Sequence, residues 1–144
     1  MASFVKFNSV AANVFNGVVN LSSDVVKVIL TNTAPVATNA VYADVSGNEL
    51  ATGNGYTAGG ATVTLTSSTQ TGGLYKYIAS CASPTWTASG SVGPFRYVII
   101  YDTTPSSPLK PLLGWWDFGS SLTMNSGDTF TVQLDPTNGV IQMS

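Results

Sequence analysis

The 144-residue chain contains no histidine and a single cysteine, Cys81. Histidine is the most common general base and metal ligand, so its absence excludes Ser–His–Asp and Cys–His catalytic arrangements and argues against a zinc site. A lone cysteine cannot form a disulfide bond within one chain. Without a base beside it, Cys81 is better interpreted as a small residue near a strand end than as a reactive thiol or an intersubunit bridge. We therefore predict no catalytic residue, no cofactor and no metal site.

Charged side chains are also scarce, at 8% of the chain against about 25% in an average globular protein. The basic residues are scattered, so no surface suited to nucleic acid is predicted. They are Lys6, Lys27, Lys76, Arg96 and Lys110. Apolar residues form 44% of the chain, which argues against disorder. The surface must therefore consist mainly of Ser, Thr, Asn, Gly and Gln, a composition common in extracellular and virion β-proteins.

Long apolar runs are missing as well. No segment approaches the roughly 20 apolar residues that cross a bilayer, and the start of the chain, MASFVKFNSV, lacks the apolar core of a secretory signal. We expect neither membrane association nor export by that route. Assembly in the cytoplasm and release by lysis would suit a protein that acts outside the cell. The length suits one domain, residues 1–144.

The longest run of aromatic and β-branched residues is Phe95–Asp102. Extended, it would carry apolar side chains on both faces, which predicts a central strand covered on both sides. Thr103–Lys110 is rich in Pro and Ser and must form a loop. We expect Pro111–Asp117 to return as a second strand, antiparallel to the first. Three residues beyond it are expected to be buried: Phe118, Leu122 and Met124.

Alternating apolar and polar residues predict further short strands, with turn signals roughly every 8–12 residues. These strands are Asp24–Thr31, Ala61–Ser67, Leu74–Ser80, Ser83–Ala88, Thr129–Asp135 and Gly139–Met143. The pattern is typical of a β-sandwich or a small barrel. We predict an all-β fold, a single antiparallel β-sandwich (jelly-roll or Ig-like) of about eight strands with an extended N-terminal segment. Ser9–Asn20 is predicted as a loop. Val41–Gly60 is predicted as a long connection with a helical turn at Val41–Asp44, held by Tyr42 and Tyr56.

Carboxylates are the remaining candidates for chemistry. Asp102 and Asp117 are expected at opposite ends of the two central strands, farther apart than the ~10 Å that glycosidase pairs tolerate. Asp44, Asn48, Glu49 and Asn54 could supply oxygen ligands from a Gly-rich loop. Their spacing does not match the calcium-binding loop, and the glycines there lack the following helix and Lys of a phosphate site. We therefore interpret these residues as turn formers.

The candidate interaction residues are aromatic. Trp115 and Trp116 are adjacent, so on a strand they face opposite ways. One is expected to fill the core, and the other to lie at a subunit contact or to stack on a sugar. Residues 1–8 alternate, which predicts either a first strand or an arm, Ala2–Asn8, that lies on a neighbouring subunit. We name Phe4, Phe7, Trp115 and Trp116 as candidate interface residues.

Six stretches of the chain, taken in order, resemble a family of small structural proteins encoded in tailed-phage and prophage genomes. They are Asn54–Val63 (NGYTAGGATV), Pro84–Gly90 (PTWTASG), Phe95–Pro105 (FRYVIIYDTTP), Pro111–Gly119 (PLLGWWDFG), Asn125–Val132 (NSGDTFTV) and Gly139–Ile141 (GVI). The resemblance covers most of the chain after residue 54, whereas residues 1–50 match only loosely.

The resemblance implies a virion component and supplies no catalytic residues. It suits a capsid decoration (cement) protein that binds the major capsid protein shell without covalent bonds, as a dimer or trimer, with the N-terminal arm as a clamp. It also suits a tail or fibre module that binds host-surface glycan through Trp115, Trp116 or the tyrosines of Val41–Gly60. Either protein would be assembled in the host cytoplasm and released by lysis within the virion. A cell-wall hydrolase is the least favoured alternative.

Overall fold

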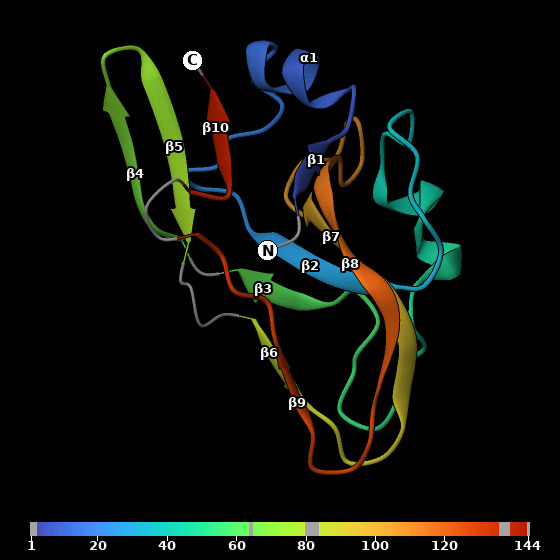
Figure 1. Ribbon diagram of the computed structural model, residues 1–144. Helices are drawn as coiled ribbons and strands as arrows, with labels where there is room; N and C mark the ends of the chain where they lie inside the picture. The colour runs from blue at the N-terminus through green and yellow to red at the C-terminus, as the bar shows by residue number, and fades with distance from the viewer. Residues whose placement is uncertain (1–2, 64, 80–83, 136–138, 144) are drawn as a thin grey trace.

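A computed structural model describes residues 3–63, 65–79, 84–135 and 139–143 of the protein, which form an all-β fold (Figure 1). Among these residues, ten strands pair antiparallel in three open sheets. The predicted antiparallel, sandwich-like architecture is therefore confirmed, with ten described strands in place of about eight.

The largest sheet has five strands in the order β1-β8-β7-β2-β3. Their bounds are β1 Phe4–Lys6, β8 Leu112–Met124, β7 Val92–Asp102, β2 Val26–Thr31 and β3 Ala61–Val63. β7 and β8 are by far the longest strands of this sheet. They form the antiparallel pair predicted from Phe95–Asp102 and Pro111–Asp117, although β8 continues to Met124.

The predicted central strand is confirmed by the burial of β7. Val98, Ile99 and Ile100 are all buried, so both faces of this strand are covered. Leu30 of β2 lies opposite Val98 on one side, and Trp115 of β8 lies opposite Ile99 on the other. A strand with apolar side chains on both faces is stable only between two paired neighbours and two packed layers, and the topology supplies both.

Two smaller sheets form the second layer. One has the order β10-β5-β4 and the other pairs β6 with β9. The bounds are β4 Leu65–Thr71, β5 Leu74–Ala79, β10 Ile141–Met143, β6 Thr85–Thr87 and β9 Thr129–Thr131. The strand predicted as Ala61–Ser67 is thus wrong as a single element, because β3 and β4 belong to different sheets. The chain passes from one layer to the other between them.

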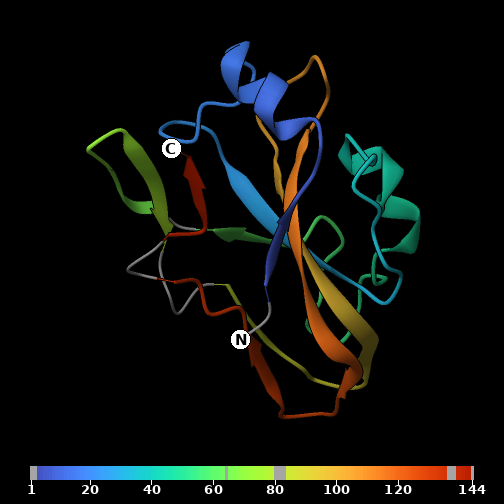
Figure 2. The same cartoon turned by 45° about the horizontal axis from the view of Figure 1, so that its top comes forward.

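The core lies between these layers. Tyr77 of β5 and Trp86 of β6 are buried in the same apolar cluster as Val28 and Ile100 of the large sheet. In both views the β4–β5–β10 sheet lies towards the end of the molecule that carries α1, and the β6–β9 pair towards the opposite end (Figures 1 and 2). The second layer is therefore divided in two, which leaves room for a groove beside it.

Short helices occupy the connections. The predicted loop Ser9–Asn20 contains a six-residue helix, α1 Val10–Phe15, with Val10 and Asn13 buried. A helix this short is marginal alone, so its packing against the sheet overrides the weak local pattern. In the connection after β2, the 3-10 turns η1 Tyr42–Asp44 and η2 Ser46–Asn48 confirm the predicted helical turn.

The connection between β2 and β3 is held by the carboxylate of Glu49. It accepts hydrogen bonds from the Tyr42 hydroxyl, from the Tyr56 hydroxyl at 2.7 Å and from the Gly59 N–H at 2.7 Å. The Tyr42 ring also stacks on Tyr101, with ring centroids 4.7 Å apart. The prediction that two tyrosines hold this connection is confirmed, and Glu49 is the group that joins them.

A second carboxyl, that of Asp102 at the end of β7, is completely buried. It accepts the Thr104 N–H at 3.1 Å through Oδ1, and its Oδ2 is buried with no hydrogen-bond partner among the described residues. Burial, followed by the neighbouring Asp24 carboxyl, raises the pKa of Asp102 to about 7. The folded protein therefore favours the protonated form of this group.

We expect the free energy of unfolding to fall as the pH rises from about 4 to about 7, because over this window the folded state holds a proton on Asp102 that the unfolded state releases. The slope should approach 1.4 kcal/mol per pH unit at its steepest, on the order given by one proton. Urea unfolding across this range measures it. Asp102→Asn cannot ionise and is the control: its unfolding free energy should lack this decline, and identical slopes for the two proteins would contradict the assignment.

Candidate functional site

Asp102 and Asp117 do not form a catalytic pair. Tyr97 lies opposite Asp117 and Tyr101 opposite Leu112, so Asp102 is five positions along β7 from the level of Asp117. At about 3.3 Å per residue the two acids are roughly 16 Å apart, which confirms the predicted separation. Over the described residues, no three His, Cys, Asp or Glu side chains come together as a metal site would require. Cys81 lies outside the described residues.

The residues considered for calcium take part in hydrogen bonds within the fold, and the Asn48 carbonyl accepts the Thr31 hydroxyl at 2.7 Å. Asp44 accepts the N–H groups of Ala40 and Val41 at 2.8 and 3.1 Å, and these bonds lower its pKa. Glu49 holds the two tyrosines, and Asn54 donates to the Ser91 carbonyl at 2.9 Å. Their interpretation as structural residues of the connection agrees with these contacts. No helix in the described part of the chain is long and apolar enough to span a membrane.

The candidate residue Phe4 lies in a strand of the body and Phe7 directly follows it, so neither belongs to a free arm. β1 pairs with β8, with Phe4 opposite Trp116 and Val5 opposite Trp115. Phe7 is fully buried, and its N–H donates to the Leu113 carbonyl at 3.2 Å. Of the two predictions for this segment, the first strand is therefore correct and the arm Ala2–Asn8 is wrong. Alternation alone does not indicate whether such a strand pairs within its own chain or with a neighbouring subunit.

The structure brings all four candidate residues together on the two faces of the β1–β8 pair. On one face of this pair, Phe7 packs on Trp115, with ring centroids 4.6 Å apart. Phe4 packs on Trp116 on the opposite face, at 5.1 Å. Both tryptophans are partly buried against the core. Gly114 makes the second contact possible, because a Cβ atom there would overlap the Phe4 ring.

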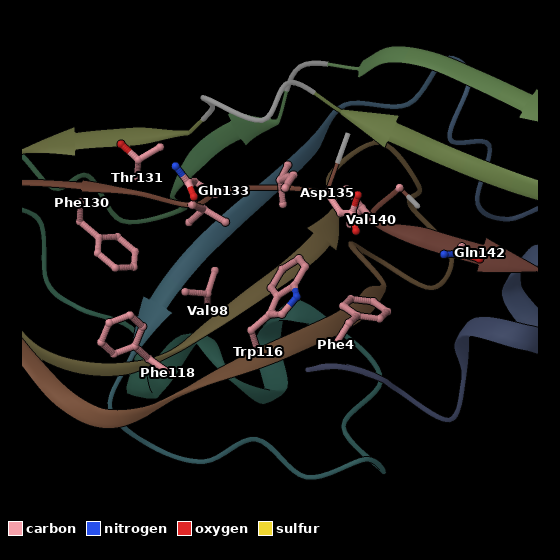
Figure 3. Close-up of a pocket in the computed structure, with 13 residues that line it drawn as sticks. Phe4, Val98, Trp116, Phe118, Phe130, Thr131, Gln133, Asp135, Val140 and Gln142 are labelled. Atoms are coloured by element: carbon pink, nitrogen blue, oxygen red, sulfur yellow. The ribbon is translucent and has the colours of Figure 1, made fainter. Parts of the chain in front are cut away.

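The Phe4–Trp116 face opens into an apolar groove of about 610 Å³ (Figure 3). Phe118 and Phe130 lie towards one end of this groove, and Trp116 and Phe4 lie towards the other. The remaining wall is formed by the strand β9 and the chain that follows it, including Gln133, Asp135 and Gln142 on the polar side. The apolar members of that wall are Val132, Leu134 and Val140, and Val98 of β7 lines the groove from the large sheet.

Phe118 was predicted to be buried, and this is wrong: half of the side chain, 52%, is exposed. Between the pair Tyr97–Asp117 and the pair Phe95–Leu122, β8 advances by more residues than β7. Residues 118–121 therefore form a bulge, with Gly119 at a φ of 96°. The bulge turns Phe118 over the edge of Phe130, with ring centroids 6.0 Å apart. Leu122 and Met124 are partly buried and buried, respectively, as predicted.

Charge in this region comes from Asp135 in the groove lining and from one ion pair next to the groove residues Trp116 and Phe118. Arg96 and Asp117 form a bidentate pair, at 2.7 and 2.9 Å, with about two-fifths of each side chain exposed. The Arg96 guanidinium holds the pKa of Asp117 below its ordinary value. An exposed pair of this kind is screened by water and salt, so it orders the bulge more than it stabilises the fold.

A second apolar hollow, of about 660 Å³, lies between α1 and the β5–β10 pair. Phe15 stands at its margin with 81% of its side chain exposed, next to Tyr75 and Ile141 in the lining. This hollow could not be predicted from the sequence, because Ser9–Asn20 lacks a long helical pattern. It contains none of the four candidate residues, so the groove at Trp116 is the stronger candidate site.

Sequence reasoning missed Phe118 and Phe130 as groove residues. Phe130 alternates with Val132 and Leu134, a pattern that indicates burial but not that the strand borders an opening. A signal for Phe118 does exist: it is followed by Gly119, Ser120 and Ser121, and a run of small polar residues inside a strand is typical of a bulge.

Comparisons of the chain with protein-family models, with curated proteins and with solved structures find no match. The resemblance to phage structural proteins thus remains a prediction, and the function is argued below from the site and the composition.

We expect the two phenylalanines of the first strand to differ in their contribution to stability. Phe7→Ala should lower the free energy of unfolding by about 3–5 kcal/mol, because it empties a fully buried site beside Trp115. Phe4→Ala should cost only about 1 kcal/mol, since Phe4 lies in an open groove. Urea unfolding followed by tryptophan fluorescence measures both. If both variants lost equally little unfolding free energy, the packing of this segment would be contradicted and a detachable arm would be favoured.

Proposed function

We propose that this protein is a structural component of a tailed-phage virion, and specifically a capsid decoration protein that binds the major capsid protein shell through non-covalent contacts. The observation that carries the proposal is the groove at Trp116, an apolar surface edged by the half-exposed ring of Phe118 on a body with very few charges. The sequence resemblance points to the same class of protein.

The groove suits a protein partner that is itself part of a rigid shell. Aromatic side chains supply large, stiff contact areas, and they are enriched at the centres of protein interfaces. Phe118 already lies at the edge of Phe130, so its position is fixed before a partner arrives. A preformed contact loses little conformational entropy on binding. Many weak contacts on one shell would then act together through avidity.

The second candidate function is a tail or fibre module that binds host-surface glycan. One observation favours it: the groove combines the exposed edge of Trp116 and Phe118 with the carboxamides of Gln133 and Gln142. Sugars are commonly held by an aromatic ring beneath the apolar face and amide groups at the hydroxyls. Loss of glycan-array binding in Trp116→Ala would support this function, with Trp115→Ala on the other face as its matched control.

The location of the chain in the particle tests the first function. Cryo-electron microscopy of particles from the phage or prophage that carries the gene should show many copies on the head, over junctions between major capsid subunits. Particles made with Phe118→Ser should carry about tenfold fewer copies at limiting concentration, the effect of roughly 1.4 kcal/mol in binding. The unfolding midpoint should not change, since half of Phe118 is exposed.

Leu109→Ser provides the matched control for that experiment. Leu109 is also exposed, at 61%, but lies in the loop at the other end of the β7–β8 pair. Its substitution should leave occupancy of the shell unaltered. Equal losses from both variants would indicate non-specific adhesion, and density for the chain in the tail alone would overturn the decoration function.

A further inference from the structure

The terminal strand of the smaller three-stranded sheet, β4, presents a long free edge in the described fold. In the order β10-β5-β4, β4 pairs with β5 on one side only. Over the described residues no strand or bridge pairs with its outer side. The β4–β5 hairpin projects from the body, and β4 lies on its outside in both views (Figures 1 and 2). Another chain can therefore approach this edge without meeting the rest of the molecule.

The register of the hairpin determines which backbone groups of β4 point outwards. Gly72 and Gly73, both with positive φ, form the two-residue turn, and Thr71 lies opposite Leu74. In such a turn the flanking pair exchanges both hydrogen bonds, and pairs then alternate along the ladder. Thr69 therefore bonds inwards to β5, whereas Ser68 and Gln70 direct their N–H and C=O groups outwards. Within one copy, no strand among the described residues pairs with these outward groups.

Natural proteins usually block such an edge with a charge, a proline or a very short strand. The other terminal strands of the sheets of three or more strands, β1, β3 and β10, have three residues each. β4 has seven, LTSSTQT, with no charged residue and no proline. Its one irregularity is the register shift between Leu65 and Ser67, at the end away from the turn. The edge is thus long and unprotected where it projects.

We propose that two copies of this chain associate by pairing their β4 strands antiparallel, across a two-fold axis at Ser68. Ser68 is the middle residue of the seven, so its outward groups would meet Ser68 of the second copy, and Gln70 would meet the region of Thr66. An uncharged edge suits self-pairing because it places no like charges opposite each other. The result is one six-stranded sheet across the dimer. This inference deepens the proposed function by identifying the surface through which copies associate.

The contact is expected to be weak in solution. A stable interface normally buries about 1,200–2,000 Å² in total, and one strand edge contributes less than that. We therefore expect dissociation at roughly micromolar concentrations. On a shell with many copies, even such a dimer would add avidity to each copy's attachment.

Sedimentation equilibrium of the purified full chain should show a reversible monomer–dimer equilibrium. Gln70→Pro removes one outward N–H from each copy and leaves the inward bonds of Thr69 and Thr71 in place, so Kd should rise by about 10- to 100-fold. Gln70→Ala retains the N–H and is the matched control, with Kd expected to be unchanged. A monomer at all soluble concentrations, a trimer, or equal Kd values for the wild type and Gln70→Pro would overturn the proposal.

Two further measurements keep the test decisive if the proline disturbs the hairpin. Ser68→Lys should dissociate the dimer by placing two like charges at the axis, as should Ser68→Glu, while an equal mixture of the two should form heterodimers. Hydrogen exchange should slow at the Ser68 and Gln70 amides as concentration rises, with Thr69 protected at every concentration. Failure of the mixture to dimerise, or concentration-independent exchange at Ser68, would overturn the inference. Neither measurement uses particles, so failure here leaves the shell-occupancy test to decide the proposed function separately.

Discussion

The antiparallel pairing of β7 with β8 is the interaction on which the other parts of this protein depend. From Val98 to Tyr101, β7 is buried on both faces and paired along both edges, so this part of the strand depends on the flanking strands β2 and β8. β8 extends beyond the region that β1 covers, and its bulge at residues 118–121 directs Phe118 into the groove. The groove therefore depends on the difference in length between β8 and the strand at its outer edge: β8 has 13 residues and β1 has three.

The scarcity of charge decides how this fold is stabilised. With few ion pairs available, long connections are held by hydroxyl and backbone groups gathered on single carboxylates. Glu49 accepts hydrogen bonds from three donors in the β2–β3 connection, and one of them, Tyr42, stacks on Tyr101. Burial raises the pKa of Tyr101 to about 12. Hydrogen bonds to a charged acceptor are stronger than those between neutral groups. One partly buried carboxylate can therefore hold a connection in place of several surface ion pairs.

Sequence reasoning recovered the parts of the structure that depend on strong local patterns. The run of β-branched and aromatic residues at Phe95–Asp102 identifies the central strand because few other structures bury both faces. The pairing of residues 4–6 with Trp115 and Trp116 could not be predicted, since it joins segments about 110 positions apart and alternation carries no information on the partner strand. Phe118 was misplaced for a related reason: a bulge shifts every later side chain relative to the simple alternation. The helix α1 was missed because its packing, and not its local sequence, stabilises six residues.

The scarcity of charge also decides how the surface is protected. Charges at edges and around apolar surfaces are the usual means by which proteins discourage unintended contacts. Here the groove at Trp116 has a single charged residue in its described lining, Asp135. The nearby Arg96 and Asp117 neutralise each other, and β4 carries no charge. A protein that worked alone in solution would gain nothing from leaving both surfaces unprotected. In a repeating assembly the two surfaces would have different partners, since a groove accepts a side chain and a strand edge accepts a backbone. One copy could then bind its shell and its neighbour at the same time without competition between the two contacts.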